Sequence, residues 1–206
     1  MEFSQLITER RSVKSYDPEF TISDEELKSL FEEVTWTPSS FNLQHWFFIA
    51  VKDRDLKLKI KQAAWGQQHV EDCSVIILIC GKLDAHKDAD VVFQNAPKEI
   101  RDKMVPMIQN FYQGNDLLIR DEAIRSASLA AMTLMLAAKN RGYGTCPLIG
   151  FDPDAVTKLL GLKDNTIPVM FLTLGKQKNP PRARDYRRPV EEVVRWNGQD
   201  GLGLGQ

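Results

Sequence analysis

The sequence predicts an α+β domain in which a small sheet is surrounded by many helices. Residues 46–51, 74–80 and 169–174 are continuous apolar runs, which is typical of strands covered on both faces. The longest stretch of helical periodicity, residues 121–140, is apolar on nearly every side between 127 and 138. That helix should therefore lie in the centre of the fold.

The first helices are predicted from their start signals and periodicity. Ser23 and Glu26 form a capping box, and apolar residues then recur at helical spacing as far as Val34. Residues 56–64 alternate like a strand at first but also fit one face of a helix. Because the acidic Asp53 lies at the favourable end of that helix, we interpret the segment as helical.

Two later helices are predicted in the same way. Residues 97–112 place their apolar side chains on one helical face, and Pro106 within them predicts a kink or a break. Asp152 and Pro153 supply an N-cap and a proline at the first helical position, and Gly161 ends the helix that follows.

Composition places the chain among ordinary globular proteins. With 206 residues, 43% of them hydrophobic, it is long enough for one well-packed domain, expected over residues 1–197. The Gly-rich residues 198–206 are expected to form a mobile tail. The net charge of −1 favours neither nucleic acid nor an anionic membrane, and no apolar run is long enough to cross a bilayer.

Cysteine and histidine content argues against a disulfide framework and against a metal site. The three cysteines, Cys73, Cys80 and Cys146, are odd in number and have no C-x-x-C spacing, and the three histidines are scattered. We therefore expect no bound metal and a reducing, cytoplasmic location. Neither a G-x-G-x-x-G nor a Walker motif is present.

The N-terminal motif is Arg10-Arg11-Ser12-Val13-Lys14, which packs three cations and a hydroxyl into five residues. In extended structure Arg10, Ser12 and Lys14 share one face, while Arg11 and Val13 face away. Arginine offers a planar set of donors that suits phosphate oxygens. One face of this segment could then bind one anionic ligand. Alternatively, the motif is a solvated basic patch.

A polar loop precedes the first predicted strand. Pro38, Ser39, Ser40 and Asn42 crowd small polar side chains that could meet a polyol or the edge of an aromatic ring. The alternative is an ordinary turn whose side chains satisfy their own backbone.

A second loop, residues 142–152, contains three glycines, which let backbone approach a ligand closely. It includes Pro147, Leu148, Ile149 and Gly150. The alternative is a helix cap followed by a simple connection.

Two more arginines, Arg187 and Arg188, lie in residues 185–194 near the C-terminus. They are a further candidate site, and the alternative is a charged surface loop. No Ser-His-Asp or Cys-His arrangement accompanies them, so a hydrolase is not indicated.

The order and spacing of these motifs resemble those of the FMN-binding nitroreductase family. The resemblance extends over roughly residues 4–196, although residues 85–113 carry no matching motif. The similar segments are Arg10-x-Ser12-x-Lys14, Pro38-Ser39-Ser40-x-Asn42-x-Gln44-x-Trp46, residues 66–71, residues 147–152, residues 174–176 and residues 187–194.

The resemblance implies a nitroreductase-like fold, a small mixed sheet surrounded by helices, with a C-terminal arm exchanged in a homodimer. It implies FMN at the dimer interface and ping-pong hydride transfer from NAD(P)H, through flavin N5, to an electron-poor small-molecule acceptor such as a nitroaromatic or a quinone. The alternatives are a flavin or ene reductase on the same scaffold, a non-catalytic FMN-binding or storage protein, and a phosphate- or nucleic-acid-binding module. The sequence names neither the acceptor nor the preferred nicotinamide, and Phe111 and Tyr112 are candidates to line the pocket.

Roles for individual residues follow from the resemblance. Arg10, Ser12 and Arg187 would hold the FMN phosphate, and Gln67 would bond the pyrimidine edge of the ring. Lys14 would lie near N1 and O2 and stabilise the anionic reduced flavin.

The remaining roles concern the loops. The backbone N–H of Ile149 would face N5, with Gly150 beside it, and the loop of residues 38–42 would reach the flavin of the other subunit. Some family members carry Glu in place of Ile149, so only a backbone role is carried over there. Lys14 and Ile149 are the expected catalytic residues. The full expected cofactor-binding set is Arg10, Arg11, Ser12, Lys14, Pro38, Ser39, Ser40, Asn42, Gln67, Pro147, Leu148, Ile149, Gly150 and Arg187.

Overall fold

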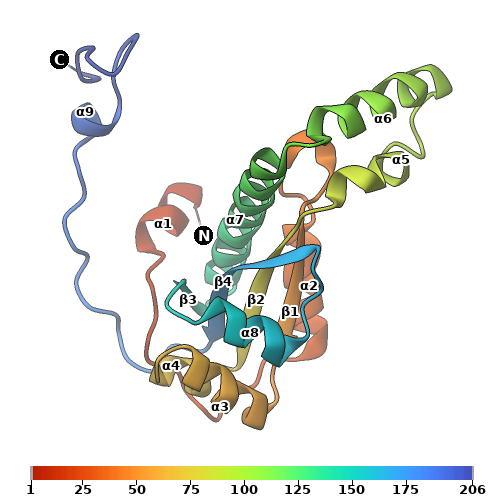
Figure 1. Ribbon diagram of the computed structural model, residues 1–206. Coiled ribbons are helices and arrows are strands. Elements are labelled where there is room, and N and C mark those ends of the chain that lie inside the picture. The colour runs from red at the N-terminus through yellow and green to blue at the C-terminus, as the bar shows by residue number, and fades with distance from the viewer. Residues whose placement is uncertain (1, 206) are drawn as a thin grey trace.

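The computed structural model describes residues 2–205, and it consists of one sheet with helices on both faces (Figure 1). The α+β prediction is confirmed. Each neighbouring pair of strands is antiparallel, in the order β1-β2-β4-β3. The strands are β1 (Trp46–Val51), β2 (Val75–Lys82), β3 (Gly144–Leu148) and β4 (Thr166–Gly175).

The sheet differs from the mixed one that the resemblance implied. Among the described residues, parallel pairing is limited to an isolated bridge between Ser12 and Thr145. The N-terminal segment could form a parallel edge strand beside β3, but it leaves β3 after this bridge. Tyr16 then pairs antiparallel with Gln177, just beyond β4. The four strands that remain all alternate in direction.

Strand β3 lies in the segment that the sequence assigned to a loop. Gly144 and Pro147 are poor strand formers, so the local signal is weak. The structure tolerates them because β3 is the last strand of the sheet and pairs only with β4.

The helices agree with the capping and periodicity signals. The Ser23 side chain accepts a hydrogen bond from the backbone N–H of Glu26, and Asp53 caps the segment predicted to be helical rather than extended. One helix continues through Pro106 without a break. The helical segments are α1 (Phe3–Glu9), α2 (Asp24–Val34), η1 (Ser40–Asn42), α3 (Arg54–Ala63), α4 (Gln68–Asp72), η2 (Ala85–Asp88), α5 (Ala89–Val92), α6 (Lys98–Tyr112), α7 (Asp116–Asn140), α8 (Pro153–Leu160) and α9 (Val190–Val193).

The central strand β2 has both faces buried, as its continuous apolar sequence predicts. Val75, Ile77 and Ile79 pack in the hydrophobic core on the side of α2 and α7. Ile76 and Leu78 belong to a second core on the opposite face, together with residues of α3 and α8. Alternation along one strand therefore divides the interior into two layers.

Helix α7 begins earlier than predicted, at Asp116, and packs closely on one face of the sheet. A Cβ added at Gly81 of β2 would lie only 3.0 Å from the Cβ of Ala123, so both residues must be small. The other side of α7 leaves Leu129 and Met132 exposed, so its own chain does not cover it on every side. No helix within residues 2–205 is long and apolar enough to cross a membrane.

Beyond β4 the chain leaves the body of the domain. Residues 179–205, here called the C-terminal arm, run past α1 and end in α9, away from the sheet (Figure 1). The described part of the predicted mobile tail, residues 198–205, folds back on the arm through a bridge between Arg195 and Gly203. The apolar side chains that the arm leaves exposed are Tyr186, Val190, Val193, Val194, Trp196 and Leu202.

Candidate functional site

The N-terminal motif alternates as predicted at residues 12–14, but Arg11, which was predicted to face away, lines the same cavity as Arg10. Ser12 and Lys14 are exposed, whereas Val13 between them is buried. The N–H of Val13 donates to the carbonyl of Thr145 over 2.9 Å. A Cβ at Gly144 would lie 2.8 Å from Cγ2 of Val13, so the glycine lets the motif lie directly against β3.

A cavity of about 650 Å³, here called the basic cavity, opens beside this motif. The structure thus brings Arg187 of the C-terminal arm next to the N-terminal motif, which lies near the other end of the sequence. Arg182 and Arg184 also line it, and sequence reasoning missed both. The predicted residues that line the cavity are Arg10, Arg11, Ser12, Lys14 and Arg187.

Arg10 carries the clearest sign of a missing ligand. Its Nη1 is buried and has no hydrogen-bond partner among residues 2–205. Burial, together with the neighbouring cations of Arg184 and Arg187, lowers the pKa of Arg10. An unpaired buried donor surrounded by like charge is costly unless an anion is present. The terminal phosphate of a nucleotide cofactor fits this requirement.

The C-terminal arm is attached to the motif by arginine–backbone hydrogen bonds. Nη2 of Arg184 donates to the carbonyls of Thr8 and Arg10, over 2.5 and 3.0 Å. Nη2 of Arg11 donates to the carbonyl of Arg182. Arg11 is therefore engaged by the arm, whereas Arg10 keeps a free donor.

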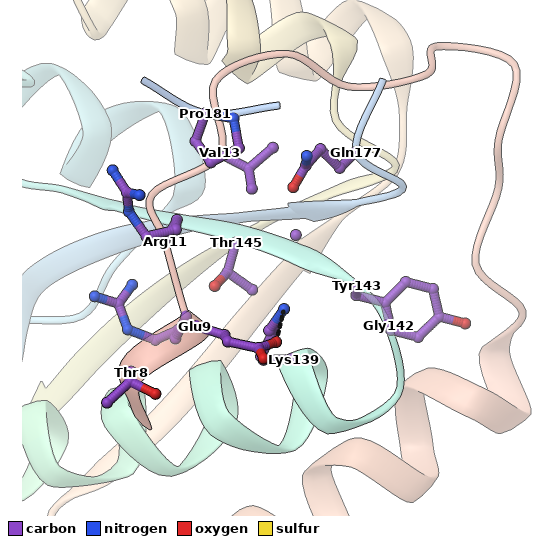
Figure 2. Close-up of a pocket in the computed structure, with 12 residues that line it drawn as sticks. Thr8, Glu9, Arg11, Val13, Lys139, Gly142, Tyr143, Thr145, Gln177 and Pro181 are labelled. Atoms are coloured by element: carbon purple, nitrogen blue, oxygen red, sulfur yellow. Dashed lines mark ion pairs between the residues drawn. The ribbon is translucent and has the colours of Figure 1, made fainter. Parts of the chain in front are cut away.

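A second hollow, of about 340 Å³, lies on the other side of the motif (Figure 2). Figure 2 shows Glu9 and Lys139 meeting there, and their side chains form an ion pair at 3.6 Å. Each cavity has one carboxylate in its lining, Glu9 here and Asp185 in the basic cavity. The basic cavity is better suited to a phosphate because more arginines line it.

The flavin-edge residues predicted from the sequence meet at the turn between α3 and α4. Nε2 of Gln67 donates to the carbonyl of Gly150 over 3.0 Å. A Cβ at Gly150 would lie 3.1 Å from Cζ3 of Trp65, so the indole lies directly against this loop. Ile149 is 78% exposed. In contrast, the side chain of Leu148 belongs to the core, so only its backbone could face a ligand.

Lys14 connects the arginines of the basic cavity with the group formed by Gln67 and Gly150. It lines the basic cavity, and its charge acts on His69 of α4 and on Cys146 of β3. His69 lies two residues after Gln67, within the similar segment 66–71, and no role of its own was predicted for it. The site therefore extends from the arginines, past Lys14, to Gln67 and Gly150.

The loop of residues 38–42 lies apart from the predicted phosphate-binding and ring-binding residues. The Tyr112 hydroxyl donates to Oγ of Ser40 over 3.0 Å, and Phe41 packs on Phe111 and Tyr112 at the end of α6. Figure 1 shows α6 at the opposite end of the molecule from α4. Within one chain, Pro38, Ser39, Ser40 and Asn42 thus lie near the pocket candidates Phe111 and Tyr112 but not near the predicted phosphate-binding and ring-binding residues.

Comparison with known proteins assigns the chain to a family. The model of the Nitroreductase family matches residues 7–176, which is most of the chain. The chain belongs to the nitroreductase family. Its relatives include the Bacillus subtilis (strain 168) protein named “Putative NAD(P)H nitroreductase MhqN”, 41% identical over 95% of this chain and 98% of that protein. Protein DrgA of Synechocystis sp. (strain ATCC 27184 / PCC 6803 / Kazusa) is 38% identical over 92% and 91%.

Solved nitroreductase structures have the same fold. A Bacillus subtilis structure described as “putative nitroreductase ydfN” superposes with a TM-score of 0.91 at 40% identity, covering 94% of this chain and 98% of that one. One from Exiguobacterium sibiricum 255-15, described as “a putative nitroreductase in complex with FMN”, has a TM-score of 0.90 at 30% identity, covering 96% and 98%. This chain therefore has the nitroreductase fold, and the family assignment rests on sequence and structure together.

Proposed function

We propose that the protein is an FMN-dependent oxidoreductase that passes electrons from NAD(P)H to an electron-poor acceptor such as a quinone or a nitroaromatic. The observation that carries the proposal is Arg10, whose buried Nη1 has no partner among residues 2–205 and whose side chain lines a cavity together with Ser12 and Arg187. A relative of 41% identity is named for NAD(P)H, and a similar solved structure holds FMN.

In this proposal the basic cavity holds the FMN phosphate. Arg10 and Arg187 donate charge-assisted hydrogen bonds, and the Ser12 hydroxyl adds a neutral donor. Arg184 and Arg11 hold the arm against the motif, because both already bond to backbone carbonyls.

The other end of the site orients the ring. When bound, FMN supplies two-electron redox chemistry, and donor and acceptor use it in turn. Gln67, already fixed to Gly150, presents its amide to the polar ring edge, and Lys14 places a positive charge at the same edge. The backbone N–H of Ile149 would face N5, and Trp65 and the exposed Ile149 side chain would form a wall for the acceptor.

We further propose a homodimer in which each chain completes the site of the other. The loop of residues 38–42 cannot serve its own chain's site from the far end of the molecule, and the apolar side chains of the arm are uncovered. A partner subunit would cover the arm and receive the loop. The proposed domain spans residues 1–197, and the reduced cysteines Cys73, Cys80 and Cys146 suit the cytoplasm.

Steady-state kinetics tests the catalytic proposal. NAD(P)H oxidation by the purified protein should depend on added quinone, nitroaromatic or enone and should show the parallel lines of a ping-pong mechanism in double-reciprocal plots. A protein that binds FMN but oxidises neither nicotinamide with any of these acceptors would instead be a binding or storage protein.

Lys14→Met should give a folded, FMN-binding protein with a lower flavin midpoint potential. Reduction adds negative charge near N1 and O2, and removal of the nearby cation disfavours that charge. Anaerobic redox titration measures the potential. Lys163→Met, which removes an exposed lysine from the turn before β4, should leave it unchanged. A potential that is unchanged or raised in Lys14→Met would exclude this role.

A further inference from the structure

His69 is a buried histidine whose side chain lacks a partner. It lies on α4, and its side chain is 5% exposed. Nε2 has no hydrogen-bond partner among residues 2–205. A histidine with only a packing role normally has its buried ring nitrogens bonded, because an unpaired buried polar atom destabilises the fold.

The surroundings of His69 show where a partner would come from. Burial, and then the charge of Lys14, lower the pKa of His69, while Asp72 on the same helix raises it. Lys61 of α3 is paired with Glu71 of α4 at 2.8 Å. Lys57 of α3 is also engaged, because its Nζ donates to the backbone carbonyls of residues 71 and 73. The ring is therefore neutral near pH 7, and Lys14 is the cation that acts on it.

We propose that His69 is a second ring-edge residue beside Lys14, and that it takes up a proton when the bound flavin gains two electrons. This inference rests on the proposed function. The isoalloxazine ring has one strongly polar end, the pyrimidine, and a hydrocarbon end. The unpaired Nε2, the amide of Gln67 and the ammonium of Lys14 are polar groups that match only the pyrimidine end.

The proton balance defines the proposal. Two electrons from the donor and one proton convert oxidised flavin into its reduced anion. The new negative charge next to His69 favours the imidazolium, so its pKa rises on reduction and a second proton is taken from solvent. Between the two pKa values of His69, reduction then takes up two protons per two electrons. Outside that interval it takes up one.

The experiment measures protonation directly in the FMN-bound protein. Imidazole ¹⁵N NMR spectra are recorded for the oxidised protein and for the anaerobically reduced protein near pH 7. His69→Gln assigns the signal and removes the titrating group while keeping a polar side chain. His86→Gln removes a histidine that stacks on Tyr112 at the far end of the molecule, and serves as the matched control. The pH dependence of the midpoint potential is measured for all three proteins.

The His69 signal should change from the neutral to the imidazolium pattern on reduction. The potential of the wild type and of His86→Gln should fall with pH at two protons per two electrons near pH 7, and that of His69→Gln at one. If none of the three histidine rings of the wild type becomes an imidazolium on reduction, the proposal is overturned even if His69→Gln fails to fold. An identical pH slope in a folded, FMN-bound His69→Gln would overturn it too. A wild type that binds no FMN would overturn the proposed function as well.

Discussion

Truncation of the chain after Asn179 should abolish both dimerisation and FMN binding. The change removes Arg187, which lines the basic cavity, and the apolar side chains that we expect to lie on the partner. It keeps the hydrogen bond from the N–H of Lys178 to the carbonyl of Ser15, so β4 and the N-terminal segment remain joined. Sedimentation velocity and the flavin content of the purified protein measure the two losses.

A shorter truncation provides the control. Removal of residues 198–206 takes away a segment whose described part folds back on residues 194–196 of the arm, and the protein should remain a dimer with bound flavin. Because the proposed sites are shared, added FMN should strengthen the wild-type dimer by mass action. A truncated monomer that still binds FMN at micromolar concentration would exclude the shared-site model.

Arg10→Ala should weaken FMN binding at least ten-fold. A hydrogen bond to a charged partner contributes ~1.5–3 kcal/mol, and each 1.4 kcal/mol corresponds to about ten-fold in Kd. Arg187→Ala should have a similar effect, because Arg187 lines the same cavity. Fluorescence titration of the apoprotein with FMN gives the dissociation constants.

Arg11→Ala is the matched control for the same change in charge. Its guanidinium donates to the carbonyl of Arg182, so we expect a smaller loss that reflects a loosened arm. Equal losses for Arg10→Ala, Arg11→Ala and Arg187→Ala would indicate a diffuse positive patch instead of a defined phosphate site.

The fold was largely predictable because burial leaves a strong local pattern. The continuous apolar run of β2 predicts two covered faces, and Val75 and Ile76 do point to different cores. The antiparallel pairing of all four strands was not predicted, because pairing depends on where the connections return and not on local sequence. Strand β3 was missed because its stability comes from pairing with β4, while Gly144 and Pro147 signal a loop.

The residues of the site could be predicted only where they lie close together in the sequence. Arg10, Ser12 and Lys14 could be placed on one face from alternation alone, but only the resemblance connected them with Arg187. Arg184 and His69 were missed because the contacts that reveal a role for them involve residues distant in sequence. Arg184 bonds to the carbonyl of Arg10, and Lys14 acts on His69. The opposite-subunit role of residues 38–42 is still a prediction.

The most direct test of the central claim is the visible spectrum of the purified protein, followed by titration of the apoprotein with FMN and with FAD. We predict a yellow protein that releases non-covalent FMN on denaturation. The apoprotein should rebind FMN, but not FAD, at one molecule per chain, because the proposed site of Arg10, Ser12 and Arg187 suits one terminal phosphate. A colourless protein that fails to bind added FMN would contradict the account.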